Sequence, residues 1–409
     1  MEQQRMIDRL ATDVERELKE NILQFWIDHT VDTEHGGFYG RITNAMQIDR
    51  SAPKSLVLNS RILWTFSRAY NFYRAAEYLA IAERAYKYLI DAFWDQEFGG
   101  FYWMVDARGD AIQKHKQVYG EVFGVYALSE YYKATHQTEA LTFAQRIYEK
   151  LERHAFDPVY NGYVEALSQN WQATDCLRLS AQDLNEKKSM NTHLHLLEAY
   201  TNLYSIWNDQ ELGHKLKNAI DIMIEKILDP ETLHFVLFFD EYWHFKSDTI
   251  SFGHEIEGTW LIYDAVTLLN DEAYRKKVER IILDISDNVY QYALENSGNG
   301  QWLVNEQDGS GKRDPDKVWW VQAEACVGFF NAYQLTGKEY FLEAVYKLWN
   351  FIQEHCVDNV HGEWFSYISE NGEVNNNRDK VEAWKGPYHN ARACIELLER
   401  IKGIQHANE

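Results

Sequence analysis

The chain has 409 residues, 45% of them hydrophobic, and a formal net charge of −22 from 41 basic and 63 acidic side chains. A field of that sign repels phosphate backbones and anionic lipid surfaces, and no basic cluster is interleaved with aromatic residues, so we expect neither nucleic acid nor membrane as a partner. The 26 tyrosines and 14 tryptophans leave neutral ligands such as sugars open, because these side chains combine a flat apolar face with a hydrogen-bonding tip.

The N-terminal segment MEQQRMIDRLATDVERELKENILQFW is charged throughout and amphipathic, unlike a secretory signal peptide. No run approaches the roughly 18–20 apolar residues of a membrane span, so we expect a soluble, cytoplasmic protein. With only 5 prolines and no linker-like tract, residues 1–409 are expected to form a single domain. The cysteines show no CxxC spacing and are expected to be reduced thiols at positions Cys176, Cys326, Cys356 and Cys394.

Six turn-like segments recur along the chain. In order they read DTEHGGFYG, DQEFGGFYW, DPVYNGYVE, DPETLHFVL, NSGNGQWLV and DNVHGEWFS. Each begins with Asp or Asn and reaches an aromatic residue that starts a short alternating stretch, namely Phe38, Phe101, Tyr163, Phe235, Trp302 and Trp364. The separations of 63, 62, 72, 67 and 62 residues indicate a sixfold internal repeat.

Two helical patterns alternate between these turns. One is apolar on nearly all sides, as expected for covered helices, in LNSRILWTFSRAY, VYGEVFGVYALSEYY, NTHLHLLEAYTNLY, GHEIEGTWLIYDAV, VWWVQAEACVGFFNAY and YHNARACIELLERI. The other carries charge on one face, as in YLAIAERAYKYLIDAFW and EYFLEAVYKLWNFIQEH. Six inner and six outer helices predict an all-α fold, an (α/α)6 barrel with short β-hairpin-like loops at one rim.

Polar or aromatic residues recur at the starts of the otherwise apolar inner helices. Since these starts converge on one mouth of a closed barrel, polar and aromatic side chains there are expected to line a common cleft. Taken singly, each is explained as well by helix capping or by a satisfied core histidine. The set comprises Arg61, Tyr119, Asn191, His193, His195, His254, Glu257, Trp319, Trp320, Gln322, Glu324 and His389.

Neither a metal nor a cofactor is expected. In HEIEG, Glu257 follows His254 by three residues and no second histidine completes an HExxH motif, while His193 and His195 are two apart and splay to different faces. Two histidines and a carboxylate assembled across helices remain an alternative. No GxGxxG or Walker motif is present, so no nucleotide cofactor is implied.

The histidines favour proton transfer over hydrolysis. A glycosidase needs a flanking carboxylate pair, for which only Glu257 and Glu324 are available. An imidazole titrates near pH 6.5, so His254 and His389 could deprotonate one face of a carbon next to a carbonyl and reprotonate the other. Other cleft residues would hold the enolate oxygen (Arg61 and Asn191), stack on sugar rings (Trp319, Trp320 and Trp384), or orient His254 or bind a hydroxyl (Glu257).

Four motifs carry a resemblance over essentially the whole chain. NTHLHLLEAY, GHEIEGTWL, KVWWVQAEA and AWKGPYHNAR resemble the N-acylglucosamine 2-epimerase superfamily, and within it most closely the cellobiose 2-epimerases. The resemblance implies an (α/α)6 barrel that converts the reducing-end glucose of β-1,4-linked disaccharides such as cellobiose and lactose to mannose, through ring opening and a cis-enediol. It implies catalytic roles for His254, His389 and His195, and substrate contacts for Arg61, Tyr119, Asn191, Glu257, Trp319, Trp320, Trp384 and Asp183.

Other members of the superfamily share the barrel and the histidines. Mannose-type aldose–ketose isomerases return the proton to C1 rather than C2, and N-acylglucosamine 2-epimerases act on monosaccharides. The aromatic surface of Trp319, Trp320 and Trp384 favours a disaccharide. A glycoside hydrolase or a non-catalytic sugar-binding barrel are the alternatives of other classes, and the expected assembly is a monomer or weak homodimer.

Overall fold

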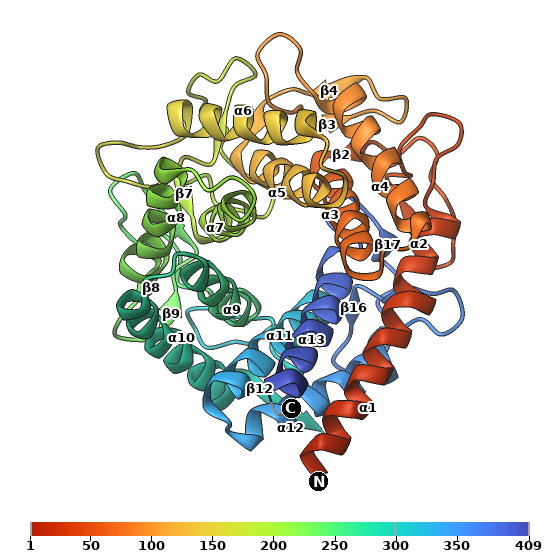
Figure 1. The fold of residues 1–409 in the computed structure, drawn as a ribbon, viewed down its shortest axis with the longest axis vertical. Coiled ribbons are helices and arrows are strands. Elements are labelled where there is room, and N and C mark those ends of the chain that lie inside the picture. The colour runs from red at the N-terminus through yellow and green to blue at the C-terminus, as the bar shows by residue number, and fades with distance from the viewer. Residues whose placement is uncertain (1, 298–299, 408–409) are drawn as a thin grey trace.

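The computed structural model describes residues 2–297 and 300–407, in which helices form two concentric rings (Figure 1). The inner ring consists of α3 (Leu56–Tyr73), α5 (Val118–Thr135), α7 (Met190–Tyr204), α9 (Phe252–Leu268), α11 (Trp319–Thr336) and α13 (Tyr388–Ala407). The outer ring begins with one continuous helical segment, made of α1 (Glu2–Arg16), the π-helical turn Glu17–Leu23 and α2 (Gln24–His29). Its other five members are α4 (Ala76–Tyr88), α6 (Thr138–His154), α8 (Gln210–Ile222), α10 (Glu272–Ala293) and α12 (Glu339–Phe351). Inner and outer helices alternate along the chain, and the ring closes where α13 packs against α1 and α3. The predicted all-α (α/α)6 barrel is confirmed.

Local sequence explains where these helices begin and end. The hydroxyls of Ser55 and Ser189 cap α3 and α7 by accepting the backbone N–H three residues on, at 3.0 Å and 3.1 Å. Several inner helices end at a residue with left-handed backbone, among them Gly337 with φ of 68°. π-helical turns continue four outer segments, at Glu17–Leu23, Leu89–Phe93, Met223–Ile227 and Ile352–Cys356. No helix among the described residues is long and apolar enough to cross a membrane.

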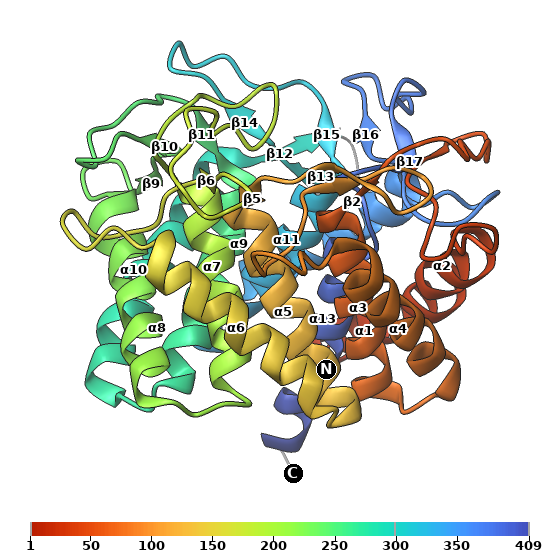
Figure 2. The ribbon, with the colours of Figure 1, turned by 90° about the horizontal axis from the view of Figure 1, so that it is seen from above.

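Short antiparallel strands gather at one rim of the barrel (Figure 2). Five of them, β2, β5, β7, β11 and β15, lead directly into an inner helix, so the N-terminal ends of those helices also lie at this rim. The first strand, β1, pairs with the last, β17, through Ile42 and Val381, which closes the ring of loops as well. The strands are β1 (Ile42–Thr43), β2 (Lys54–Ser55), β3 (Met104–Val105), β4 (Ala111–Gln113), β5 (Lys116–Gln117), β6 (Ala166–Leu167), β7 (Lys188–Ser189), β8 (Leu228–Asp229), β9 (His234–Phe235), β10 (Phe238–Phe239), β11 (Ile250–Ser251), β12 (Leu294–Ser297), β13 (Gly300–Leu303), β14 (Glu306–Gln307), β15 (Lys317–Val318), β16 (Tyr367–Ile368) and β17 (Asp379–Val381).

Rim loops are bound to the inner helices by hydrogen bonds from the backbone N–H groups of repeated aromatic residues. One repeat differs in register. The backbone N–H of Phe101 donates to the side chain of Glu121, and that of Tyr163 donates to His193, at 2.8 Å and 2.9 Å. In the fifth repeat the equivalent N–H, to Gln322 at 2.8 Å, belongs to Leu303. The alignment of Trp302 with the other aromatic residues was therefore wrong by one position. Leu303 is buried, whereas Trp302 is partly exposed and pairs with Glu295 in the longer β12–β13 hairpin.

Buried lysines make a second recurring contact between the rim loops and the helix starts, and this contact was not predicted from the sequence. In four repeats the lysine of the strand before an inner helix bonds the aspartate that opens the preceding turn. The pairs are Lys54–Asp32 at 2.8 Å, Lys116–Asp95 at 2.9 Å, Lys188–Asp157 at 2.8 Å, and Lys380–Asp358. Each lysine also donates to a backbone carbonyl of that turn, so the rim loops are held to the helix starts that they surround.

Candidate active site

A cavity of about 200 Å³ lies among the starts of the inner helices. It is lined by all but one of the predicted catalytic and substrate-binding residues: Arg61, Tyr119, Asn191, His195, His254, Glu257, Trp319, Trp320, Trp384 and His389. Asp183 is the exception, because it lines an adjoining cavity of about 90 Å³ that shares only Asn191 and His254 with the first. The prediction missed four lining residues in the loops before α13, namely Ser366, Tyr367, Glu382 and Lys385.

His195 on α7 is held by a carboxylate one turn along the same helix. Its Nδ1 lies 2.9 Å from Oε2 of Glu198, which also accepts the hydroxyl of Tyr388 at 2.6 Å. Burial raises the pKa of Glu198, but the neighbouring Arg392 and His195 outweigh this effect and bring it to about 2. Since an ionised carboxylate only accepts, Nδ1 of His195 donates to Glu198, and its Nε2 has no hydrogen-bond partner among the described residues.

His389 on α13 is held in the same way by Glu324 of α11. Its Nδ1 lies 2.7 Å from Oε1 of Glu324. Burial, with Arg61 and Arg392 nearby, keeps the pKa of His389 well below its ordinary 6.5. The imidazole is therefore neutral at pH 7 and able to accept a proton.

His254 on α9 has a different kind of partner. Its Nδ1 lies 2.7 Å from the hydroxyl oxygen of Ser251, which can either donate or accept. Burial, and then the charge of His195, lowers the pKa of His254 to about 3. The prediction that Glu257 orients His254 is wrong, because Oε1 of Glu257 accepts from Arg392 and lies 4.0 Å from Nδ1 of His389.

The nearby His193 is fully occupied by backbone groups. Its Nε2 accepts the N–H of Tyr163 at 2.9 Å, and its Nδ1 lies 2.7 Å from the carbonyl of Ser189. Both ring nitrogens serve the fold, and His193 does not line the cavity.

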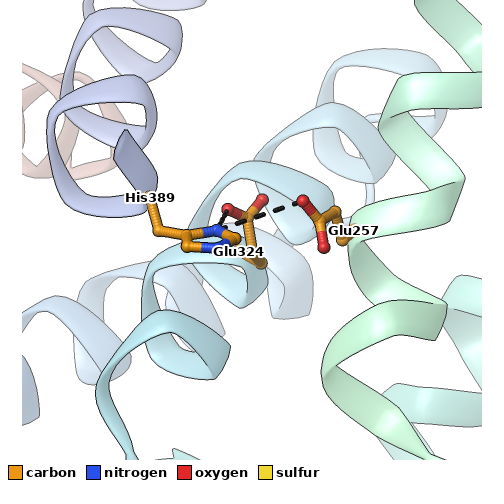
Figure 3. A group of neighbouring side chains, drawn as sticks. All are labelled: Glu257, Glu324 and His389. Atoms are coloured by element: carbon orange, nitrogen blue, oxygen red, sulfur yellow. Dashed lines mark hydrogen bonds and ion pairs between the residues drawn. The ribbon is translucent and has the colours of Figure 1, made fainter. Parts of the chain in front are cut away.

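The guanidinium of Arg392 binds three carboxylates next to the cavity. Arg392, 1% exposed, donates through Nη1 to Glu198 and through Nη2 to Glu257 and to Glu324, the last at 2.7 Å. Figure 3 shows Glu257, Glu324 and His389 pointing toward one another from α9, α11 and α13. Burial and the charge of Glu324 raise the pKa of Glu257 to about 7.

This cluster bears on the metal and hydrolase alternatives. Glu257, Glu324 and His389 offer donor atoms within 4.8 Å of one another, the geometry of a possible metal site. Nη2 of Arg392 already donates to both carboxylates, so a cation of the protein pairs with these two groups. The same contacts hold the two carboxylates side by side, whereas hydrolysis needs them on opposite sides of a glycosidic bond.

Arg61 and Asn191 line the cavity with different bonding. Arg61 donates to the hydroxyl of Tyr119 at 3.0 Å and to the backbone carbonyl of Trp384. The side-chain oxygen of Asn191 and Oε2 of Glu257 are both buried and have no hydrogen-bond partner in the protein. Because buried polar atoms are nearly always paired, these two oxygens are suited to accept hydrogen bonds from ligand hydroxyls.

The three tryptophans occupy distinct surroundings. Trp320 packs against both imidazoles, with ring centroids 4.8 Å from His254 and 5.4 Å from His389. Trp319 is buried, and the ammonium of Lys385 lies 4.5 Å from its ring. Trp384 is partly exposed and packs beside Trp103 and Tyr119.

A model of the N-acylglucosamine 2-epimerase family matches residues 37–393 of the chain. The chain belongs to this family. It is 43% identical to the cellobiose 2-epimerase of Bacteroides fragilis, over 96% of this chain and 100% of the relative. Its identity with the cellobiose 2-epimerase of Dictyoglomus turgidum is 42%, over 96% and 99% of the two chains. The solved cellobiose 2-epimerase of Bacillus thermoamylovorans superposes with a TM-score of 0.91 at 37% identity, covering 96% of this chain and 100% of that one.

Proposed function

We propose that this family member is a cellobiose 2-epimerase, which converts the reducing-end glucose of a β-1,4-linked disaccharide to mannose. Identity of 43% over nearly the full length supports this substrate class. The observation that carries the chemistry is one cavity lined by two imidazoles from different helices, the partly buried His254 of α9 and the buried His389 of α13. Each has a lowered pKa and is therefore uncharged at neutral pH.

The reaction begins with opening of the reducing-end ring. The C1–O5 bond breaks while the hydroxyl on C1 loses its proton and O5 gains one, which leaves an aldehyde at C1. We assign this proton transfer to His195, whose Nδ1–H is held by Glu198 and whose Nε2 is unbonded in the part of the chain that the structure describes. The aldehyde acidifies the neighbouring C2–H bond.

Epimerisation then needs two proton transfers on opposite faces of C2. One imidazole removes the C2 proton, the electron pair of that bond forms the C1–C2 double bond, and negative charge develops on O1. The other imidazole, which must first have taken a proton from water to become imidazolium, delivers that proton to the opposite face. The aldehyde is restored, and the first imidazole returns the proton it took from C2 to water. We assign Arg61 and the side-chain amide N–H of Asn191 as the donors to the developing oxyanion, and the N-terminal ends of the inner helices add positive potential at the same rim.

The tryptophans support a second sugar ring. We assign Trp320, which touches both imidazoles, to the reacting ring. Trp384 lies beside Tyr119 and Trp103 and is assigned to the non-reducing ring. Stacking on an aromatic face buries the apolar C–H surface of the sugar.

The test is to incubate the protein separately with cellobiose, lactose and mannose and to identify the products by NMR. Epimerase activity predicts a disaccharide that carries mannose at its reducing end, formed from cellobiose and lactose. Preferential conversion of mannose to fructose would instead identify a mannose-type isomerase. Free glucose as the main product would identify a hydrolase.

A further inference from the structure

We propose that Arg392 is a positioning residue that aligns two of the three site histidines and leaves the third independent. This inference rests on the proposed epimerase function and deepens it. Arg392 does not itself line the cavity, although it bonds Glu257, which does. It acts through the carboxylates that hold the imidazoles.

The contacts of Arg392 connect two histidines to one group. Its Nη1 bonds Glu198, whose other oxygen holds Nδ1 of His195 at 2.9 Å. Its Nη2 bonds Glu324 at 2.7 Å, and the same Glu324 oxygen holds Nδ1 of His389 at 2.7 Å. The planar fork of a guanidinium fixes both carboxylates in direction as well as in charge, which a single ammonium cannot do.

The surroundings of Arg392 allow little freedom. Its guanidinium lies 4.2 Å from the ring centroid of Tyr388 and 4.7 Å from that of Trp260, and Nη1 also donates to the Tyr388 hydroxyl. Trp260 in turn donates to Glu324 at 3.2 Å. The carboxylates are thus fixed from several sides, and their alignment depends on the shape of the arginine.

His254 lies outside this network. Its only hydrogen-bond partner in the described chain is Ser251, at the start of its own helix. A change at Arg392 should therefore disturb protonation at one face of C2 and spare the other. A merely structural role would lower the amount of active protein without favouring one face.

The enediol formed in D2O has two outcomes: return to the substrate with deuterium at C2 (exchange) or conversion to the other epimer (inversion). The ratio of exchange to inversion, called the partition here, measures this asymmetry. When His254 is the base and His389 is misaligned, the intermediate is reprotonated by His254, so recovered substrate gains deuterium at C2 without inversion. When the opposite epimer is supplied, His389 is the base and deprotonation itself slows. We expect Arg392→Lys to lower turnover roughly 10²-fold. The ratio of exchange to inversion should rise severalfold for one starting epimer and not for the other.

Two further variants keep the test decisive if Arg392→Lys does not fold. Glu324→Gln keeps the shape of the side chain that holds His389 and should shift the partition in the same direction. Glu198→Gln acts on ring opening through His195, so it should slow turnover without changing the partition.

Arg400→Lys is the matched control. Arg400 is another arginine of α13, with its side chain 11% exposed, and it bonds Asp264 at 3.1 Å and no residue that lines the cavity. We expect its replacement to change stability and to leave the partition as in the wild type.

A partition unchanged in folded Arg392→Lys and in Glu324→Gln would overturn the inference, and so would an equal shift in Arg400→Lys. A wild-type protein that forms no epimer would contradict the proposed function and the inference together. If the wild type epimerises and the variants keep its ratio of exchange to inversion, only the role of Arg392 is contradicted.

Discussion

At the scale of single residues, the two imidazoles assigned to C2 differ in what supports their charged state. Glu324 lies against Nδ1 of His389 and stabilises the imidazolium that forms when this ring takes a proton. His254 has only the hydroxyl of Ser251, so its imidazolium depends on the substrate and on the wider field of the site. The two half-reactions are therefore not equivalent, although they act on one carbon.

Both imidazoles are nevertheless expected to be essential. We predict that His254→Ala and His389→Ala each lower turnover by about 10²–10⁴-fold, the loss typical of a missing general acid or base. Steady-state kinetics with cellobiose measures the loss, and circular dichroism establishes that each variant is folded. Near-normal turnover in either folded variant would refute the assignment of that histidine.

The assignment of the tryptophans makes a prediction about substrate length. Loss of a stacking platform of roughly 60 Å² costs on the order of 1.5 kcal/mol, or about tenfold in affinity. Trp384→Ala should therefore raise KM for cellobiose about tenfold and leave any activity on mannose nearly unchanged. Trp320→Ala should instead lower kcat for both substrates, because this ring packs against both imidazoles. Equal effects of Trp384→Ala on both substrates would contradict its assignment to the distal ring.

The lining residues were largely predictable from the sequence because they recur at the start of each inner helix. Their partners were not, since Arg392 meets Glu257 and Glu198 across separations of 135 and 194 residues. A signal was present: Glu198 in HLHLLEAY and Arg392 in HNARAC are charged residues inside otherwise apolar segments. Buried charges require partners, which marks such positions for pairing without naming the pairs.

At the scale of helices and strands, the repeat predicted the order and the layers of the barrel, because aromatic turn residues and apolar helices recur at near-equal intervals. It failed at Trp302, because in the longer β12–β13 hairpin the N–H that donates to Gln322 belongs to Leu303. Register in a hairpin depends on the turn, so the pairing position could not be read from residue type alone. Trp302 was aligned with the other aromatic residues although the equivalent position is Leu303.

The side chains that bind the loop N–H form the same pair of backbone contacts in the third and fifth repeats. Gln322 accepts the N–H of Leu303 and donates to the carbonyl of Val318 four residues earlier. His193 likewise accepts the N–H of Tyr163, and its Nδ1 faces the carbonyl of Ser189, four residues earlier. Glutamine therefore already performs, in the fifth repeat, the bonding that histidine performs in the third.

This equivalence predicts a change in the pH dependence of stability. Burial lowers the pKa of His193 to about 4, against 6.5 when it is unfolded, so the unfolded chain binds the extra proton first and stability falls as the pH drops from 6.5 toward 4. His193→Gln removes this effect. Its free energy of unfolding, relative to the wild type, should improve by about 2 kcal/mol between pH 7 and pH 5. Urea denaturation at the two pH values provides the measurement, and parallel pH profiles would contradict the role given to His193.

At the scale of the whole molecule, the closed double ring brings residues from six inner helices to one rim and supplies its own cation there. Because Arg392 bonds both Glu257 and Glu324, we predict that activity persists after dialysis against EDTA and is not raised by divalent ions. Activity that vanished with EDTA and returned with a metal would restore the ligand interpretation of Glu257, Glu324 and His389. A change of kcat of less than about twofold is the expected result.

In the proposed mechanism the two imidazoles exchange protons at C2 of a reducing-end sugar. Incubation with cellobiose in D2O, followed by NMR of product and recovered substrate, tests this exchange. We expect deuterium at C2 of the mannose-ended product, with the glycosidic bond intact. Deuterium at C1 of a ketose product, or cleavage to free glucose without any exchange at C2, would contradict it.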